Sequence, residues 1–484
     1  MGQHIHIAIV GAGFAGLGAA IGLKNDGEHD FLVFERADEI GGTWRDNSYP
    51  GCACDVPSHL YSYSFAPNPD WTSTYSAQDE IWAYQRQCVD RFGVGPHLRL
   101  GHAVHEIGWD EAGRVWHLDT ARAAMTADVV IVATGALSEP AIPPLPGLDD
   151  FAGTVFHSAR WRHDHDLTGR RVAVVGTGAS TAQFVPAIQP KVDRLLVFQR
   201  TPAWVLPRRA RPITRTERAV FRLFPPTQRL VRLSVFWSRE LFVLGFRHPR
   251  LMRALQRAAE THLRRSVPDP VLRARLRPTY TMGCKRIVVS NDYWPTLGRP
   301  NVDVVTAPIR EVRPSAVVTA DGQAHEVDTI ILGTGFHVTD APIARHVTGV
   351  GGRSLAEAWR PTMRAYLGTT VTGFPNLFFL FGPNTGLGHT SVLLMLESQI
   401  SHVLAVLAHR RRLGADAVEP TPEAVERYTA EVDAKMRGTV WSQGGCSSWY
   451  LDAAGRNSAL WPGFTFAYRR RSRRFRPGAY RVAG

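Results

Sequence analysis

The chain has 484 residues, and its 44% hydrophobic and 20% charged content is enough to build the cores of two or three domains. The formal net charge of +13 is large, but no recognised nucleic-acid-binding motif accompanies it, which excludes a nucleic-acid partner. No apolar run reaches the length that a bilayer requires, and an apolar strand begins by about Ile5, too early for a secretory signal. Five cysteines, few and odd in number, suit a reducing compartment, so we expect a cytoplasmic protein without a transmembrane segment.

The N-terminal segment has the pattern of a dinucleotide-binding unit. An apolar strand from Ile5 to Val10 leads into an Ala-rich helix through the glycine pattern Gly11-Ala12-Gly13-Phe14-Ala15-Gly16. Such glycines allow a tight turn and let backbone N–H groups at the start of the helix approach a pyrophosphate. The next strand ends at Glu35, where a carboxylate accepts hydrogen bonds from the hydroxyls of an adenosine ribose.

Three patterns follow before the second unit. The segment Gly41 to Asp55 contains Gly41-Gly42-Thr43-Trp44, Tyr49-Pro50-Gly51 and the two cysteines Cys52 and Cys54. A buried strand from Asp128 ends in Thr134-Gly135, where the chain can turn beneath a cofactor. The third pattern is F-x-G-x-x-x-H-x-x-x-W, formed by Phe151, Gly153, His157 and Trp161. A disulfide between Cys52 and Cys54 would close a very small, strained ring, so we predict that no redox pair forms there.

A second glycine-rich turn predicts a second dinucleotide site with a different preference. The strand Arg171 to Val175 leads into Gly176-Thr177-Gly178-Ala179-Ser180-Thr181, and the following strand ends at Arg200, the same distance from its first glycine as Glu35. An arginine at this place favours the 2′-phosphate of NADPH. One chain is therefore predicted to hold two different dinucleotides, which indicates redox chemistry.

Residues 205–278 carry the positive charge of the chain. They contain 18 arginines, no lysine and four acidic residues, a local balance of +14, so the remainder is close to neutral. Phe, Leu and Trp are interleaved with the arginines, which is typical of amphipathic helices. We expect a helical excursion with solvated arginines; attachment to an anionic membrane surface or an acidic partner stays open as the alternative.

The segment from Asp328 to Phe336 is a second buried apolar strand that ends in Thr-Gly, like the one from Asp128 to Gly135. We expect the chain to cross from one domain to the other at each of these two strands. Because the second nucleotide unit lies between the two crossings, we predict an α/β fold with two Rossmann-like dinucleotide-binding domains. Residues 1–150 and 335–484 would form the first domain, and residues 151–334, including the Arg-rich excursion 205–278, would be inserted as the second.

On these motifs the chain resembles the type I Baeyer–Villiger monooxygenases, a branch of the class B flavin-dependent monooxygenases. The segment Gly41 to Asp55 matches the family pattern A/G-G-x-W-x4-F/Y-P-G/M-x3-D at every defined position, and Phe151 to Trp161 matches a second family pattern. Counterparts of Lys285-Arg286, Gly382 to His389 and Ser448-Trp449 also occur in the family. The chain departs from the family at Arg162, where Pro or Asp is usual, and at Thr181, where the residue is usually small.

The resemblance implies an NADPH-dependent enzyme that binds FAD at the first unit and NADPH at the second, and no metal. The reduced flavin would trap O2 as a C4a-peroxide, and the enzyme would insert one oxygen atom next to a ketone carbonyl to give an ester or lactone. Besides the two fingerprints, cofactor contacts are implied for Thr43, Trp44, Asp55, Thr201, Lys285 and Trp449. Among these, Lys285 is expected near the 2′-phosphate and Trp449 near the nicotinamide half.

The resemblance also assigns the catalytic residues. Arg286 would hold the peroxide in its deprotonated, nucleophilic form, since a guanidinium keeps its charge under working conditions. Asp55 would orient Arg286 as an ion-pair partner. His157 is expected to be structural, Trp44 and Trp161 to be packing anchors, and His389 to support the flavin site by packing. The alternative for Arg286, a plain surface charge in an Arg-rich region, stays open.

Two other functions remain as alternatives at this point. One is N- or S-oxygenation by the same flavin chemistry, which Trp161 disfavours because nitrogen- and sulfur-oxidising relatives usually have Tyr or Phe there. The other is an NADPH-dependent flavin reductase that oxygenates nothing, which the lack of a C-x-x-C motif disfavours.

Overall fold

The first nucleotide unit lies at the centre of an eight-stranded sheet in a computed structural model that describes residues 3–483. Strand β1 (Gln3–Val10) pairs in parallel with β2 (Phe31–Phe34) on one side and β6 (Met125–Val132) on the other. A strand that is covered on both faces and both edges requires a nearly continuous apolar run, which Ile5 to Val10 supplies. The other strands of this sheet are β3 (Leu98–Arg99), β4 (Val104–Asp110), β5 (Val115–Thr120), β17 (Val347–Thr348) and β18 (Leu377–Phe379).

Helices from both ends of the chain pack around this sheet. Helix α12 (Val392–Leu413) contacts α1 (Phe14–Asn25) and α15 (Thr465–Arg473). The expectation that no apolar run reaches bilayer length is wrong for α12, which is long and apolar enough to cross a membrane. However, 61% of its apolar window is buried inside the protein, as in the core helix of a globular domain. The remaining elements of this lobe are α2 (Thr43–Asp46), α3 (Gln78–Arg91), α11 (Leu355–Ala358), α13 (Pro422–Met436), α14 (Val440–Gln443), β19 (Ala417–Pro420) and β20 (Tyr480–Ala483).

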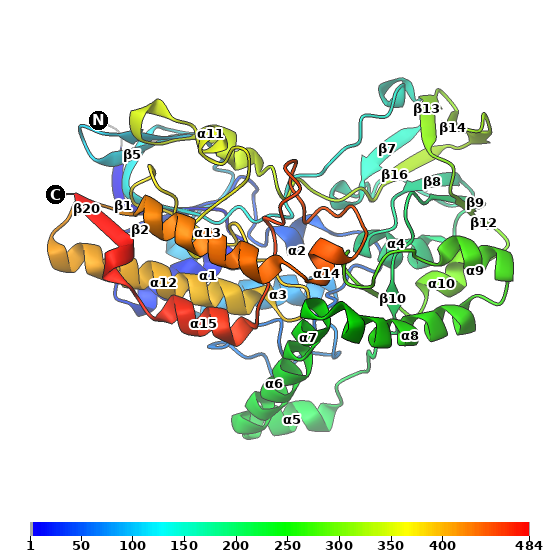
Figure 1. Ribbon diagram of the computed structural model, residues 1–484, viewed down its shortest axis with the longest axis horizontal. Coiled ribbons are helices and arrows are strands. Elements are labelled where there is room, and N and C mark those ends of the chain that lie inside the picture. The colour runs from blue at the N-terminus through cyan, green and yellow to red at the C-terminus, as the bar shows by residue number, and fades with distance from the viewer. Residues whose placement is uncertain (1–2, 484) are drawn as a thin grey trace.

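The second nucleotide unit forms a separate lobe (Figure 1). Its five-stranded parallel sheet has the order β12-β9-β8-β16-β7. The strands are β7 (Thr154–His157), β8 (Arg171–Val175), β9 (Arg194–Phe198), β12 (Val302–Val305) and β16 (Thr329–Leu332). Helices α4 (Ala179–Ile188) and α10 (Tyr293–Leu297) pack beside it, and β13 (Ile309–Arg313), β14 (Ala316–Thr319) and β15 (Ala324–Glu326) form a small antiparallel sheet.

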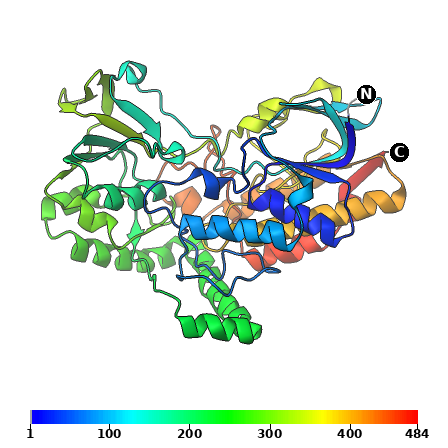
Figure 2. The ribbon, with the colours of Figure 1, turned by 180° about the vertical axis from the view of Figure 1, so that it is seen from behind.

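The chain returns to the first lobe after β16, which confirms the predicted fold class. Strand β18 follows the second sheet in sequence but pairs in parallel with β6 of the first, and β17 pairs with β4. The two views of the ribbon show the same two lobes, with both termini on the first (Figures 1 and 2). The domain that begins the chain is therefore split by the inserted one.

The Arg-rich segment is helical, as predicted. It comprises β10 (Val205–Leu206), α5 (Arg215–Leu223), α6 (Pro225–Glu240), α7 (Phe242–Arg247), α8 (Pro249–Ser266) and α9 (Pro270–Leu276), and β10 pairs with β11 (Val288–Val289). Its side chains differ from the usual amphipathic arrangement, because Leu223, Phe224 and Leu230 are exposed whereas Glu240 is fully buried. Helices α5 and α6 extend away from both lobes (Figure 1).

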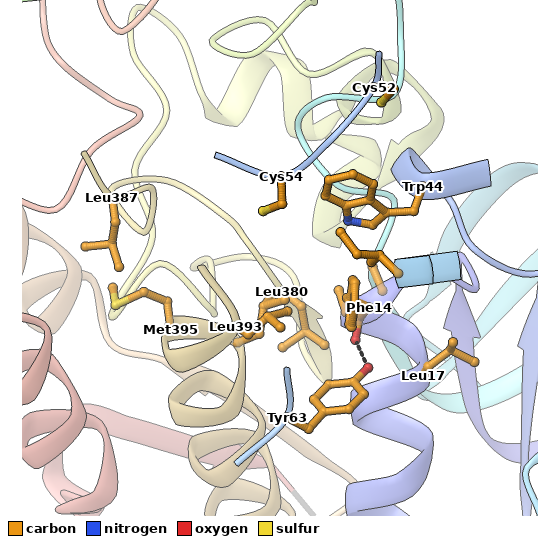
Figure 3. Close-up of a cluster of buried hydrophobic side chains, with 14 of the residues drawn as sticks. Phe14, Leu17, Trp44, Cys52, Cys54, Tyr63, Leu380, Leu387, Leu393 and Met395 are labelled. Atoms are coloured by element: carbon orange, nitrogen blue, oxygen red, sulfur yellow. Dashed lines mark hydrogen bonds between the residues drawn. The ribbon is translucent and has the colours of Figure 1, made fainter. Parts of the chain in front are cut away.

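The core of the first lobe reaches the segment between Gly41 and Asp55. A buried cluster joins residues of α1, of this segment and of the stretch 380–395, and it includes Phe14, Trp44, Cys54, Leu380 and Leu393 (Figure 3). The hydroxyl of Tyr63 donates a hydrogen bond of 2.6 Å to the carbonyl oxygen of Phe14. The start of α1 and the Gly41–Asp55 segment are thus held in one packed unit.

Candidate active site

The backbone that follows each crossing strand lies close to the first glycine of one nucleotide turn. Gly11 has a φ of +107°, and a Cβ atom there would lie 2.7 Å from the carbonyl oxygen of Ala133. Gly176 has a φ of +117°, and its Cβ would lie 2.3 Å from the carbonyl oxygen of Gly333. Only glycine fits either position, because a side chain would displace the backbone that follows the crossing strand.

The helix starts at both turns are suited to bind phosphate. Gly13 and Gly178 precede α1 and α4 and have no side chain that caps the first N–H groups of the helix. A Cβ atom on Gly16 would lie 1.8 Å from the carbonyl oxygen of Gly11, so this glycine permits the close helix–strand packing. Uncapped N–H groups at a helix start are a general anion-binding arrangement.

Glu35 is buried at the end of β2, where its carboxylate ties the strand to the turn. It accepts hydrogen bonds from the backbone N–H of Ala12 at 2.9 Å and of Ala37 at 3.1 Å, and it pairs with Arg45 at 3.0 Å. A carboxylate has about four acceptor positions, so these three contacts leave capacity for a ribose hydroxyl. The arrangement fits the adenosine end of FAD.

A hollow of about 290 Å³ opens beside Glu35 between the two lobes. Its lining includes Trp161 and three arginines, Arg36, Arg45 and Arg160. Each arginine pairs with a carboxylate: Arg36 with Glu139, Arg45 with Glu35, and Arg160 with Asp46, which also lines the hollow. The lining is therefore of mixed charge.

The Gly41–Asp55 segment begins directly on the first turn. The N–H of Gly41 donates to the carbonyl oxygen of Ala12 at 2.9 Å, and Gly42 lies against Gly13. Trp44 is buried and its indole N–H donates to the hydroxyl of Tyr61 at 2.9 Å, as expected for a packing anchor. Thr43 begins α2 and is exposed.

The same segment then contacts helix α4 of the second lobe. The amide of Gln183 donates to the carbonyl oxygen of Ala53 at 2.9 Å, and its oxygen accepts from the hydroxyl of Tyr49 at 3.0 Å. A Cβ atom on Gly51 would lie 2.8 Å from the carbonyl oxygen of Gln183. Gln183 therefore joins the two lobes, and the sequence offered no signal for it because the contact spans 130 residues.

The second family pattern also packs at this junction. The ring of Trp161 lies 5.4 Å from that of Phe184 on α4, and Tyr49 approaches the same Phe184 from the first lobe. Phe151 belongs to the core of the second lobe, and a Cβ atom on Gly153 would lie 2.4 Å from the carbonyl oxygen of Asp328. Trp161 therefore packs at the junction of the lobes, whereas Phe151 and Gly153 pack within the second lobe.

His157 is a buried, neutral histidine. Its Nδ1 accepts from the N–H of Ala159 at 3.1 Å, and its ring packs against Phe336 of the second crossing. Burial lowers the pKa of the imidazole to about 4. An imidazole with so low a pKa is neutral near pH 7 and is a poor proton carrier there.

Thr181 is accommodated by Gly333, which directly follows strand β16. It is fully buried, and a Cβ atom on Gly333 would lie 2.2 Å from its hydroxyl oxygen. The extra volume of Thr181 occupies the space that a side chain at position 333 would take. The other departure, Arg162, is an exposed residue that pairs with Asp164 at 2.7 Å.

Arg200 and Lys285 lie close together near the end of β9. Burial lowers the pKa of the Lys285 ammonium, and the nearby charge of Arg200 lowers it further. Within residues 3–483 neither side chain has a carboxylate partner within 4.0 Å. The adjacent Thr201 accepts a hydrogen bond of 2.8 Å from Thr177 of the glycine turn through its carbonyl oxygen. Two neighbouring cations without a counter-ion fit the 2′-phosphate of NADPH.

Asp55 and Arg286 form a bidentate ion pair. The Nε of Arg286 donates to one carboxylate oxygen at 2.8 Å, and Nη2 lies 2.7 Å and 2.6 Å from the two oxygens. The charge of Asp55 raises the pKa of Arg286 above its ordinary value. The Arg286 side chain is 35% exposed, so it is neither a free surface charge nor sealed off.

A tyrosine that the sequence patterns missed lies beside this pair. Tyr450 is 2% exposed; burial raises the pKa of its phenol to about 12, and the charge of Arg286 opposes that rise. Its neighbour Trp449 is 45% exposed, with ring centroids 4.2 Å apart. Trp449 was singled out for its family counterpart, whereas only the fold brings Tyr450 to Arg286.

A disulfide joins the loop of Arg286 to the loop of Trp449. Cys284 and Cys446 are bonded, with their Cα atoms 6.2 Å apart and 162 residues between them in sequence. This pair differs from the expectation of scattered, unpaired cysteines, because two positions distant in sequence carry no pairing signal. Cys52 and Cys54 are free and buried, and burial raises the pKa of Cys52 to about 12.

His389 is also fully buried. Its Nε2 lies 3.3 Å from a carboxylate oxygen of Glu240, the last residue of α6, and its ring is near Phe246 of α7. It therefore connects the Gly382–His389 turn to the helical excursion, a more specific contact than the packing role expected for it.

Comparisons with known proteins agree with this geometry. Residues 4–216 match the model of the family described as flavin-binding monooxygenase-like. A Baeyer–Villiger monooxygenase of Streptomyces coelicolor is 52% identical over 482 residues, covering 99% of this chain and 93% of that protein. One of Pseudomonas aeruginosa is 48% identical over 484 residues, covering 99% and 92%.

Solved structures give the same result. The closed crystal structure of cyclohexanone monooxygenase superposes with a TM-score of 0.87 at 29% identity, and each chain is covered completely. A crystal structure of the OTEMO complex with FAD and NADP has a TM-score of 0.91 at 28% identity, again over the full length of both chains.

Proposed function

The chain belongs to the Baeyer–Villiger monooxygenases, and we propose that Arg286 and Asp55 are the residues on which its oxygen insertion depends. It is an FAD- and NADPH-dependent enzyme that inserts one oxygen atom from O2 next to a ketone carbonyl. Bound FAD supplies the redox centre that accepts a hydride from NADPH and activates O2.

The bidentate pair of Arg286 and Asp55 is the observation that carries this proposal. The guanidinium does not lose its proton under working conditions, and Asp55 fixes its orientation through three short contacts. A fixed positive charge stabilises negative charge that develops on a reacting oxygen, most effectively where water is excluded. Arg286 is the catalytic residue in this proposal, and Asp55 is its positioning residue.

The remaining site residues bind and orient the two cofactors. The Gly11–Gly16 turn, Glu35 and the Gly41–Trp44 segment would hold FAD, supported by the uncapped start of α1 and the free acceptor position of Glu35. The Gly176–Thr181 turn, Arg200, Thr201 and Lys285 would hold NADPH, supported by the two cations without a counter-ion. Tyr450, which lies beside Arg286, and Trp449, which packs on Tyr450, would border the site on that side.

We also propose the domain limits 1–150, 151–334 and 335–484 and a cytoplasmic location. The pairing of β18 with β6 and of β16 with β7 supports the limits. The three free, buried cysteines support a reducing compartment, whereas the Cys284–Cys446 bond is of a kind that is uncommon there.

Product analysis tests the proposed reaction against its rivals. The purified holoenzyme is given NADPH, O2 and a panel of ketones, sulfides and amines, and the products are identified by mass. We expect esters or lactones from ketones. Sulfoxides or N-oxides without any ester would favour the heteroatom-oxygenating rival, and NADPH consumption without any oxygenated product would favour the reductase.

A further inference from the structure

Helix α6 has its polar side chains on the inward face. Gln228 is buried and donates to the carbonyl oxygen of Asn68, and Arg232 donates to the carbonyl oxygen of His59 at 2.7 Å and to the hydroxyl of Ser62 at 3.1 Å. Glu240 at its end is fully buried beside His389. Hydrogen bonds and charges therefore hold α6 on the protein, together with Val231, which packs against the core of the first lobe.

The opposite face of α6 and α7 is apolar and faces solvent. Five residues spaced three or four apart form what we call the apolar ridge: Leu230, Leu233, Trp237, Leu241 and Leu244. Leu230 is 67% exposed, Trp237 48% and Leu241 60%. This spacing puts them on one side of the helices, so they form a continuous stripe and not scattered single residues.

Neighbouring residues extend the ridge at both sides. Leu223 and Phe224, at the end of α5, are 85% and 61% exposed. The ring of Phe466 on α15 lies 5.8 Å from that of Trp237 and is also exposed. Since α5 and α6 extend away from both lobes, a flat partner can reach this surface (Figures 1 and 2).

The charge around the ridge is positive. Five exposed arginines of α6, α7 and the adjoining helices α5 and α8 have no carboxylate within 4.0 Å in the described part of the chain: Arg215, Arg229, Arg247, Arg250 and Arg253. The four acidic residues of the segment are engaged elsewhere. Glu217 pairs with Arg211, Glu260 with Arg277, Glu240 is buried, and Asp269 caps α9.

An apolar stripe bordered by unpaired arginines fits the surface of an anionic bilayer. Leu and Trp enter the boundary between headgroups and acyl chains, while arginines bind the phosphates. A second copy of this chain fits less well, because two faces of the same positive charge would repel each other. We propose that the enzyme docks on anionic phospholipid membranes through the apolar ridge and the arginines beside it.

The docking surface is connected to the active site through the inner face of α6. The segment 59–75 that α6 contacts begins four residues after Asp55. Given the proposed function, docking would place the enzyme where apolar ketones accumulate. The docking itself does not depend on that function, so it is measured separately from catalysis.

Vesicle sedimentation with the FAD-loaded enzyme tests the proposal. The probes are vesicles of phosphatidylglycerol mixed with phosphatidylcholine, and vesicles of phosphatidylcholine alone, at low and high salt. The ridge variant carries Leu230→Ser, Leu233→Ser and Trp237→Ser. The matched control carries Ile142→Ser, Leu413→Ser and Val482→Ser, which remove exposed apolar residues from other parts of the surface. A third variant carries Arg229→Gln, Arg247→Gln and Arg250→Gln.

The wild type and the matched control should sediment with the anionic vesicles and, at low salt, much less with phosphatidylcholine alone. The ridge variant should lose about tenfold or more in vesicle affinity, and the arginine variant should lose the preference for anionic lipid. FAD content and oxidation of a water-soluble ketone should be unchanged in all three variants, which shows that they are folded. Equal sedimentation of the ridge variant and the wild type would overturn the proposal. The proposal would also be overturned if the wild type bound no vesicles. The same holds if, in that case, light scattering showed a dimer of the wild type that the ridge variant does not form.

Discussion

Arg286 and Asp55 meet through three contacts of 2.6 to 2.8 Å although 231 residues separate them along the chain. Asp55 ends a segment that begins on the first nucleotide turn, and Arg286 follows the helical excursion of the inserted domain. The pair therefore forms only when the two lobes are assembled. Gln183 and Phe184 hold the same segment to the second lobe from the other side.

Replacing Asp55 by Asn should uncouple NADPH consumption from ketone oxidation. The amide keeps the shape of the carboxylate but removes the charge that raises the pKa of Arg286 and orients it. We expect FAD to stay bound and ester formation to fall on the order of tenfold or more, while NADPH is still oxidised. The ratio of ester formed to NADPH consumed is the readout. An unchanged ratio would mean that Asp55 does not position Arg286.

The preference for NADPH should depend on Arg200. The Arg200→Glu variant replaces one of the two cations near the end of β9 by a negative charge. We expect KM for NADPH to rise about 10- to 100-fold, the cost of a charge-assisted hydrogen bond, with little change for NADH. Arg194→Glu, on the exposed start of the same strand, is the control. Equal losses with both nucleotides would place the 2′-phosphate elsewhere.

The packing of Thr181 against Gly333 predicts a coupled pair of substitutions. Gly333→Ala places a methyl group 2.2 Å from the hydroxyl oxygen of Thr181 and should destabilise the protein by about 1–3 kcal/mol. Thr181→Ala in the same chain removes the obstacle and should restore part of that free energy of unfolding. Denaturant unfolding of the two single variants and the double variant measures the coupling. Simply additive costs would show that the two residues do not compete for the same space.

The Cys284–Cys446 bond should be detectable by counting thiols. Alkylation of the denatured protein without reductant should label the three free cysteines, Cys52, Cys54 and Cys88, and all five after reduction. Reduction should lower the melting temperature, since a disulfide contributes about 2–4 kcal/mol by restricting the unfolded chain. The Cys284→Ser, Cys446→Ser variant should show no further response to reductant. Five labelled cysteines in the untreated enzyme would contradict the pairing.

Local sequence patterns were sufficient for the parts of the site that are local. The turns at Gly11 and Gly176 are recognisable because glycine alone tolerates their backbone angles and the close approach of the crossing strands. The charge at the end of each second strand indicates the ribose substituent, because the strand geometry fixes its place. The family motifs added Asp55 and Arg286, whose pairing the structure contains.

Contacts between distant segments could not be predicted in this way. Gln183, Tyr450 and the Cys284–Cys446 bond depend on how the two lobes meet, and no local pattern encodes that arrangement. The helical excursion shows a different limit of prediction from local sequence patterns. Its helices were predictable from periodicity, but α6 places Gln228 and Arg232 inward and Leu230 outward, so periodicity alone did not indicate which face packs.

The central claim is that the fixed charge of Arg286 is required for oxygen insertion, and the Arg286→Ala variant tests it most directly. The measurement is the ester formed per NADPH consumed, with FAD content determined on the same sample and Arg194→Ala as the control. We predict that FAD binding is retained and that ester formation falls on the order of 10²- to 10³-fold, as for removal of a group that stabilises developing negative charge. Ester formation at the wild-type rate by Arg286→Ala would contradict this account.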